Sequence, residues 1–173
     1  ILTCDNGIAA ISQIARAKEL GMTVIVTDHH DILTEDSETP EGREMLPPAD
    51  AVVNPKRRDS LYPFPDICGG MVAYKLVQVL YEVHKIPGEE WLGLLEIAAI
   101  ATVGDVMKLQ GENRIIVKEG LSRLEHTSNL GLRKLIEKNN LQAGNITAYH
   151  IGFVIGPCLN ASGRLQTAKI ALG

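Results

Sequence analysis

Short apolar runs alternate with helical patterns in the first half of the chain. Residues 1–4 and 22–27 are apolar or β-branched runs of strand length, and we expect the strand at residues 1–4 to be buried. Between them, apolar residues recur at helical spacing over residues 8–20. Gly21 follows this helical pattern where a glycine commonly ends a helix. Because two strands joined by a helix pair in parallel through a right-handed crossover, we expect both strands to end at one edge of a sheet.

Helical patterns dominate the rest of the chain. A third short strand is predicted at residues 51–54, after a polar, proline-containing segment. Helices are predicted at residues 71–84, 90–102, 114–124 and 132–138. The run GPCLNASGRL predicts a loop before a last helix that begins at about Gln166. We therefore expect an α/β fold, with a parallel β-sheet flanked by helices and a mostly helical C-terminal half, and the pattern predicts no domain boundary.

Composition limits the class of protein. The chain has 173 residues, of which 45% are apolar and 22% charged, which is typical of a folded globular protein. It has no apolar run long enough to span a membrane and no basic secretory leader, so we expect it in the cytoplasm. Cys4, Cys68 and Cys158 are far apart in sequence and are expected to be reduced. A net charge of −4 argues against a broadly basic nucleic-acid surface, but it permits local contacts through bound cations.

Polar residues follow both predicted strands of the first crossover. Residues 5–7 are Asp-Asn-Gly, and residues 28–30 are Asp-His-His. Open α/β sheets bind their ligands beyond the carboxyl ends of the strands. Hard divalent ions such as Mn²⁺ or Mg²⁺ favour oxygen ligands with few imidazoles. Asp5 and His29 could therefore share an ion.

Each of these residues also has a purely structural explanation. Asp105 follows the apolar run LLEIAAIATV and offers a third carboxylate, but it could equally be a helix-end residue. Asp5 could be a turn residue or the N-cap of the next helix, and His29 and His30 could be ordinary loop residues. Asp5, His29 and Asp105 together are stronger evidence for a metal site than any one of them alone.

Two basic segments could contact phosphate. The run Lys-Arg-Arg at residues 56–58 is either a solvated loop or a phosphate contact. Arg164, which follows Asn160 closely, could present its planar donors to a phosphate, or it could be a surface residue near a helix start. Aromatic residues are too few and too scattered for a base-stacking platform.

The order of motifs along the chain resembles that of the DHH phosphoesterases, and more narrowly that of the RecJ-type single-strand-specific exonucleases. The segments that carry the resemblance are TCDNGI, VTDHHDI, NPKRRDSLYPF, CGGMVAYKL, ATVGDVMKL and GPCLNASGRL. They occur in the family's order over nearly the whole chain. The resemblance therefore rests on much more than the tripeptide Asp-His-His.

The resemblance implies roles for the residues at the sheet edge. Asp5 resembles a carboxylate that bridges two divalent ions, usually Mn²⁺, with Mg²⁺ as the alternative. His29 and Asp105 resemble ligands of one of these ions. His30 resembles a histidine that faces the scissile phosphate. Asp28 would then orient the imidazole.

The last motif resembles the segment that contacts the nucleic-acid backbone in the RecJ-type branch. On this resemblance, Asn160 and Arg164 are expected to bind substrate. Cys158 stands where an arginine is expected, so one substrate contact is in doubt.

For the parent protein the resemblance implies metal-dependent 5′-to-3′ hydrolysis of single-stranded DNA in DNA repair and recombination. Residues 1–173 are expected to be a partial DHH catalytic domain that lacks the family's first motif, with two further aspartates, and the C-terminal DHHA1-type domain. The chain by itself is then expected to show little or no nuclease activity. Two alternatives remain: a DHH-type hydrolase of short oligonucleotides, cyclic dinucleotides or pyrophosphate, and a non-catalytic replication scaffold of the same fold.

Overall fold

The computed structural model describes residues 1–35, 42–142 and 144–165, apart from the side chains of residues 89 and 162–165. It divides at Pro87 and Gly88 into two compact units, a boundary that the sequence pattern did not predict. The first unit contains α1 (Ile11–Glu19), β1 (Ile25–Thr27), β2 (Ala51–Val53) and α2 (Gly69–Val83). The second contains α3 (Gly88–Leu92), α4 (Leu95–Gly104), α5 (Gly111–Leu124), α6 (Leu130–Lys138), α7 (Ala148–His150), the π-helix η1 (Ile151–Ile155) and α8 (Gly156–Leu165). No helix in the described ranges is long and apolar enough to cross a membrane.

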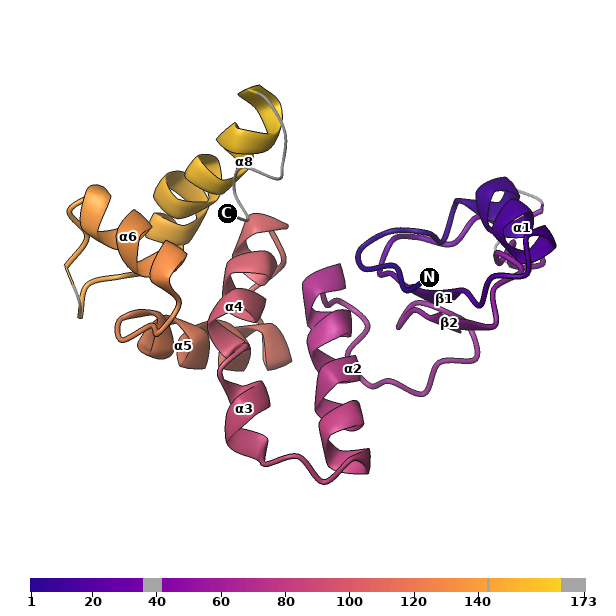
Figure 1. Cartoon of the computed structure of the whole chain (residues 1–173), viewed down its shortest axis with the longest axis horizontal. Helices are drawn as coiled ribbons and strands as arrows, with labels where there is room; N and C mark the ends of the chain where they lie inside the picture. The colour runs from indigo at the N-terminus through magenta and orange to yellow at the C-terminus, as the bar shows by residue number, and fades with distance from the viewer. Residues whose placement is uncertain (36–41, 143, 166–173) are drawn as a thin grey trace. The chain divides into compact units, whose positions relative to one another are not determined.

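Two parallel strands form the centre of the first unit (Figure 1). Ile25 of β1 lies opposite Ala51 of β2, and Thr27 lies opposite Val53. Leu2 adds a parallel bridge to Ile25 on the other side of β1. The predicted parallel pairing is therefore confirmed, and residues 5 and 28–30 follow neighbouring extended segments.

The first predicted strand is exposed, contrary to the expectation that it would be buried. Only Leu2 forms a bridge, and the exposed fractions of Ile1 and Leu2 are 61% and 59%. The reason is their position: residues 1–4 form the outer row of the sheet within the described part of the chain. Their backbone is nevertheless held, because Thr3 N donates to Ile25 O at 3.0 Å and Ile25 N donates to Ile1 O at 2.9 Å.

Helix α1 covers β1 through a small apolar core. Ile14 packs against Val24 and Val26, which are 1% and 0% exposed. The helix ends at Gly21 as predicted: Gly21 has a φ of +75°, and Met22 N donates to the carbonyl of Ala17. This 6→1 hydrogen bond with a left-handed glycine is a Schellman termination.

The second unit is built from helices around its own core. That core consists of Leu124, Leu132, Ile146, Ile151 and Ile155. Helices α4 and α5 approach closely, because Gly120 presents no side chain toward Ala99 and the carbonyl of Leu95. The single helix predicted over residues 90–102 is in fact two, α3 and α4, separated by Gly93 and Leu94. Glycine weakens a helix, which is consistent with the break.

The predicted loop at residues 156–165 is wrong, because this segment forms α8. Helix α8 continues directly from the π-helix η1, so Pro157 lies within an uninterrupted helical run over residues 148–165. A proline inside a helix disturbs its hydrogen bonds, and a π-turn next to it is a common site of such irregularity. The predicted helix start at Gln166 lies outside the described residues. The predicted fold class is confirmed: a parallel sheet with flanking helices is followed by a helical second half.

Candidate metal centre

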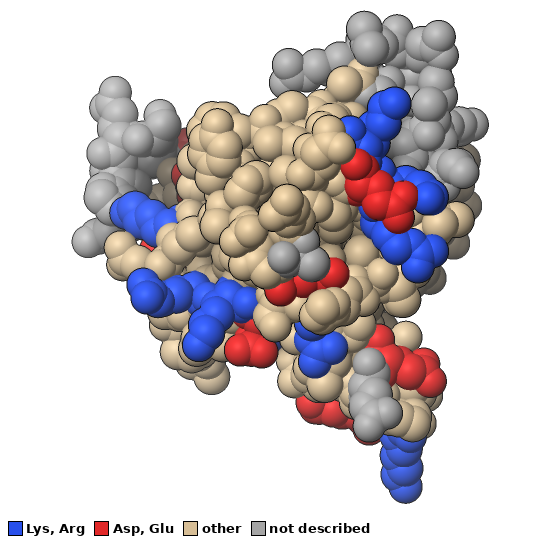
Figure 2. Space-filling view, turned by 90° about the vertical axis from the view of Figure 1, so that its left-hand side faces the viewer, with Lys and Arg blue, Asp and Glu red and all other residues tan. Residues whose placement is uncertain are grey.

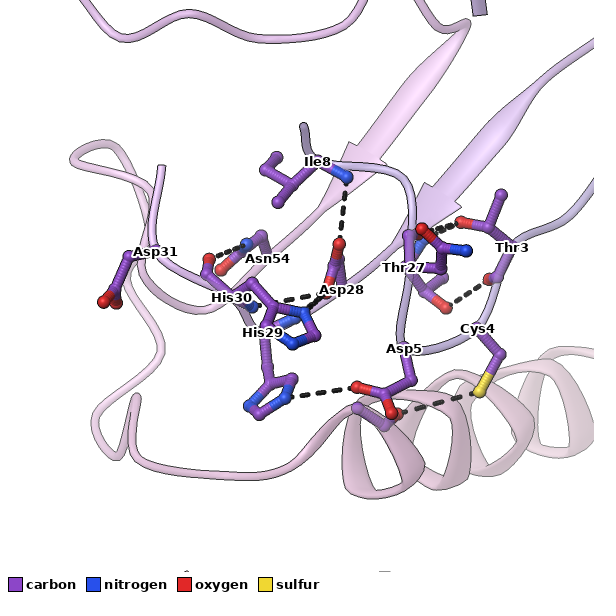
Figure 3. A network of polar contacts seen from close by, with 12 residues as sticks. Thr3, Cys4, Asp5, Ile8, Thr27, Asp28, His29, His30, Asp31 and Asn54 are labelled. Atoms are coloured by element: carbon purple, nitrogen blue, oxygen red, sulfur yellow. Dashed lines mark hydrogen bonds and ion pairs between the residues drawn. The ribbon is translucent and has the colours of Figure 1, made fainter. Parts of the chain in front are cut away.

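Three potential ligands meet beyond the carboxyl ends of the strands in the first unit (Figure 3). Asp5 Oδ1 lies 3.1 Å from His29 Nε2, and the rings of His29 and His30 lie 4.6 Å apart between centroids. One ligand atom from each of the three residues falls within 4.8 Å of the others. The structure therefore brings together Asp5 and His29, as their positions after neighbouring strands predicted, and adds His30.

Asp5 is held in an unusual backbone conformation. Its φ is +58°, a left-handed value that aspartate adopts more readily than most residues. Thr3 and Thr27 fix the preceding segment: Thr27 Oγ1 donates to Thr3 O at 2.6 Å, and Thr3 Oγ1 donates to Asn6 O at 2.6 Å. Strained backbone of this kind often occurs at functional sites.

Asp28 organises the loop that carries both histidines. It is only 1% exposed, and its Oδ1 accepts hydrogen bonds from the backbone N–H groups of His29 at 2.8 Å and His30 at 3.2 Å. The same oxygen lies 2.6 Å from His30 Nδ1, and Oδ2 accepts from Ile8 N at 2.9 Å. Burial raises the pKa of Asp28, but the hydrogen bonds from Ile8, His30 and His29 outweigh it and leave the pKa below its usual value. Asp28 is therefore an anion at neutral pH, and an anionic oxygen 2.6 Å from His30 Nδ1 favours the tautomer that carries a proton on Nδ1.

Asn54 ties the histidine loop to β2. Its side chain is buried, donates from Nδ2 to His30 O at 3.0 Å and accepts from Lys56 N at 2.9 Å. The basic run is partly neutralised, because Lys56 Nζ lies 2.8 Å from Asp31 Oδ1 and Arg57 forms two hydrogen bonds to Asp59. These contacts favour a structural role for Lys56 and Arg57 over a free phosphate contact.

The donors present fit a hard or borderline divalent ion. Asp5 offers a carboxylate whose side chain is 52% exposed, and the His29 and His30 side chains are 9% and 59% exposed. One carboxylate and two imidazoles suit Mn²⁺ better than a soft ion. The neighbouring thiol of Cys4 is not part of this group: its Sγ lies 4.0 Å from the carbonyl oxygen of Gly69, and burial, together with Asp5, raises its pKa.

The remaining predicted site residues lie in the second unit. Asp105 is exposed and directly follows α4, where its N–H donates to the carbonyl of Ala101. Asn160 is exposed on α8, and Arg164 lies in the same helix, but its side chain is outside the described part. The roles of Asp105, Asn160 and Arg164 therefore stay predictions.

Two surface features do not add to the site. A cavity of about 540 Å³ lies between β2 and α2, but Asp5, His29 and His30 do not line it. On the face drawn in Figure 2, lysine and arginine side chains alternate with acidic ones, so the described residues there form no extended basic surface. This agrees with the net charge of −4.

The first unit is thus a parallel α/β unit with a carboxylate and two imidazoles at its strand ends. Residues 1–102 match the model of the DHH family, N-terminal domain. The chain belongs to the DHH family, which confirms the resemblance of its motifs.

Two relatives support the narrower resemblance as well. The chain is 41% identical to the single-stranded-DNA-specific exonuclease RecJ of Bacillus subtilis, over 99% of this chain and 20% of the relative. It is 36% identical to RecJ of Salmonella typhimurium, over 99% of this chain and 30% of the relative. It therefore spans less than a third of the length of these two proteins.

Two solved structures are similar to the whole chain. A crystal structure of exonuclease RecJ bound to manganese superimposes with a TM-score of 0.80 at 35% identity and covers 99% of this chain and 40% of that one. RecJ from Thermus thermophilus in complex with Mn²⁺ superimposes with a TM-score of 0.79 at 34% identity and covers 99% of this chain and 24% of that one.

Two residues that shape the site were not predicted. The sequence pattern predicts only a strand end at Asn54, although Asn-Pro after a strand is a turn signal. It assigns no role to Gly69, which belongs to the segment CGGMVAYKL. A pair of glycines before an apolar helix is a signal of close backbone approach, and it could have drawn attention to this position.

Proposed function

We propose that the protein containing this chain is a metal-dependent phosphodiesterase that degrades single-stranded DNA from the 5′ end, as part of DNA repair and recombination in the cytoplasm. The cluster of Asp5, His29 and His30 at the strand ends is the observation that carries the proposal. Family membership and the similarity to RecJ exonucleases support it. Residues 1–173 are then part of a DHH catalytic domain in a longer protein.

In this proposal, Asp5, His29 and Asp105 are part of the ligand set of a two-ion site, with Mn²⁺ or Mg²⁺ as the candidates. Such ions would activate water at neutral pH and stabilise charge on the phosphate. The 3.1 Å separation of Asp5 Oδ1 and His29 Nε2 supports shared ligation, because one ion could contact both atoms at this separation.

His30 is proposed to face the scissile phosphate. Asp28 Oδ1 accepts a hydrogen bond from Nδ1 of the His30 ring and thereby orients the imidazole, so Nε2 is the nitrogen proposed to face the substrate. Asn160 and Arg164 are proposed to contact the DNA backbone. Arginine suits this role because its planar donors match two phosphate oxygens.

The test uses the whole protein with Asp5→Ala, and Asp31→Ala as the matched control. Asp31 carries the same charge one residue after the histidine pair, but its side chain is 92% exposed and pairs with Lys56 instead of the cluster. Mn²⁺ binding is measured by calorimetry, and degradation is followed on single and double strands labelled at the 5′ or 3′ end.

Asp5→Ala is expected to lose Mn²⁺ binding and single-strand degradation together, whereas Asp31→Ala keeps both. Unchanged Mn²⁺ affinity in Asp5→Ala would remove Asp5 from the ion site. Activity confined to short oligonucleotides or pyrophosphate would replace the exonuclease proposal by the other DHH-type hydrolases. Intact Mn²⁺ binding without hydrolysis of any phosphoester would point to a scaffold.

A further inference from the structure

Helix α2 begins beside Asp5, as the close-up of the polar network shows (Figure 3). Its first residue, Gly69, is buried and lies against Asp5 from 64 positions earlier in the chain. A Cβ atom at position 69 would lie 2.5 Å from Asp5 Cβ and 2.6 Å from Asp5 Cα, and nearer still to Oδ1. Carbon atoms that are not bonded do not approach this closely, so a side chain at position 69 and Asp5 in its present place exclude each other.

Relief of this contact requires a shift of the backbone on one side. The atoms that a new Cβ would meet include the Cα of Asp5, so rotation of the Asp5 side chain alone cannot relieve the overlap. On the other side, Cys68 and Met71 at the start of α2 are 1% and 0% exposed. The Asp5 loop is therefore the part that would move, because its residue already has the strained φ of +58°.

We propose that Gly69 is a positioning residue for Asp5. The absence of a side chain at the start of α2 lets the Asp5 carboxylate reach within 3.1 Å of His29 Nε2, so that both atoms point to one ion. Gly69 touches no ion or substrate in this role. The expected effect of Gly69 on metal binding rests on the proposed ion site. The expected effect of Gly69 on the position of Asp5 is independent of any ion.

The first experiment measures Mn²⁺ binding by calorimetry in Gly69→Ala, with Gly120→Ala as the control. Gly120 is also buried without room for a side chain, since a Cβ there would lie 2.6 Å from Leu95 O, but the residues it would meet, Leu95 and Ala99, belong to the second unit. Gly69→Ala is expected to weaken Mn²⁺ binding at least about tenfold, the usual effect of disturbing a residue that supports a ligand. Gly120→Ala is expected to lower thermal stability while leaving the affinity unchanged. Equal loss of affinity in both variants would overturn the proposal.

The second experiment needs no ion. A crystal structure of metal-free Gly69→Ala is expected to show Asp5 Oδ1 moved beyond about 4 Å from His29 Nε2, outside ion-pair range. Retention of the 3.1 Å contact would overturn the proposal. If the unmodified protein binds no Mn²⁺ at all, the proposed function fails, while this distance still decides the role of Gly69.

A third experiment uses a rescue variant and keeps the proposal testable if Gly69→Ala is too unstable for the first two. Asp5→Gly removes the carboxylate and Cβ that the new methyl group would meet; the Cα at 2.6 Å remains, but a glycine lets the loop backbone shift away because it tolerates a wide range of φ. The fall in melting temperature caused by Gly69→Ala is therefore expected to be smaller in the Asp5→Gly background. The same fall in both backgrounds would show that the methyl group acts elsewhere and would overturn the proposal.

Discussion

Asp28→Asn removes one negative charge from the centre of the histidine loop and keeps the shape of the side chain. The carboxylate accepts four hydrogen bonds, three at Oδ1 from His29 and His30 and one at Oδ2 from Ile8. An amide has one oxygen to offer. Its best orientation keeps the oxygen on the histidine side and turns the NH₂ group toward the N–H of Ile8, which is 3% exposed.

The size of the effect follows from these contacts. A buried donor left without an acceptor costs about 1–3 kcal/mol. The three remaining hydrogen bonds lose the assistance of the negative charge, which weakens each of them by roughly half. Together these changes are expected to lower the free energy of unfolding of the first unit by at least about 3 kcal/mol.

The assay is urea unfolding at neutral pH, combined with hydrogen exchange of the Ile8 amide as a local measure. Asp31→Asn is the matched control: it makes the same change in charge three residues away, at a side chain that is 92% exposed and pairs with Lys56. A surface pair of this kind contributes at most about 1 kcal/mol. If Asp28→Asn unfolds at the same urea concentration as Asp31→Asn, with unchanged exchange at Ile8, the hydrogen bonds of Asp28 do not stabilise the loop.

Two further predictions concern acid and a helix cap. Burial raises the pKa of Asp28, but the hydrogen bonds outweigh it and hold the pKa below its usual value. The ionised Asp28 therefore stabilises the folded chain above about pH 4, and this stabilisation is lost as the pH falls through the lowered pKa of the folded state. The difference in unfolding free energy between the unmodified chain and Asp28→Asn should therefore shrink in acid; a difference that grows as the pH falls would contradict this sign. Asn129 caps α6, since its Oδ1 accepts from Leu132 N at 3.1 Å, so Asn129→Ala should lower the unfolding free energy of the second unit by about 1 kcal/mol in urea. Asn129→Ser, which keeps an acceptor, should recover most of this loss, and equal stability of the alanine and serine variants would argue against the cap.

Local patterns in the sequence were sufficient for much of the first unit. The positions of β1 and β2, their parallel pairing and the termination of α1 before Gly21 followed from the spacing of apolar residues and from one glycine. The proximity of Asp5 and His29 followed as well, because parallel strands joined by a crossover end at the same edge of a sheet. Such inferences need only information that lies within a short stretch of chain.

Other features depend on contacts between distant segments. The helix over Gly156–Leu165 was missed, because its glycines, asparagine and proline have weak helix propensity that the surrounding helical packing overrides. The boundary between the two units at Pro87 carries a Pro-Gly turn signal, which does not distinguish a turn within one domain from a boundary between two units.

The sequence by itself determined which side chains stand at the ends of the strands, because hydrophobic periodicity and turn chemistry are local properties. Only the tertiary structure decided that the start of α2 lies against Asp5 and that the Asp28 carboxylate binds Ile8 and both histidines at once. The physical reason is that these contacts depend on the distance between elements that pack against each other. At Gly69 that distance is short because no side chain separates the start of α2 from Asp5, a residue 64 positions earlier.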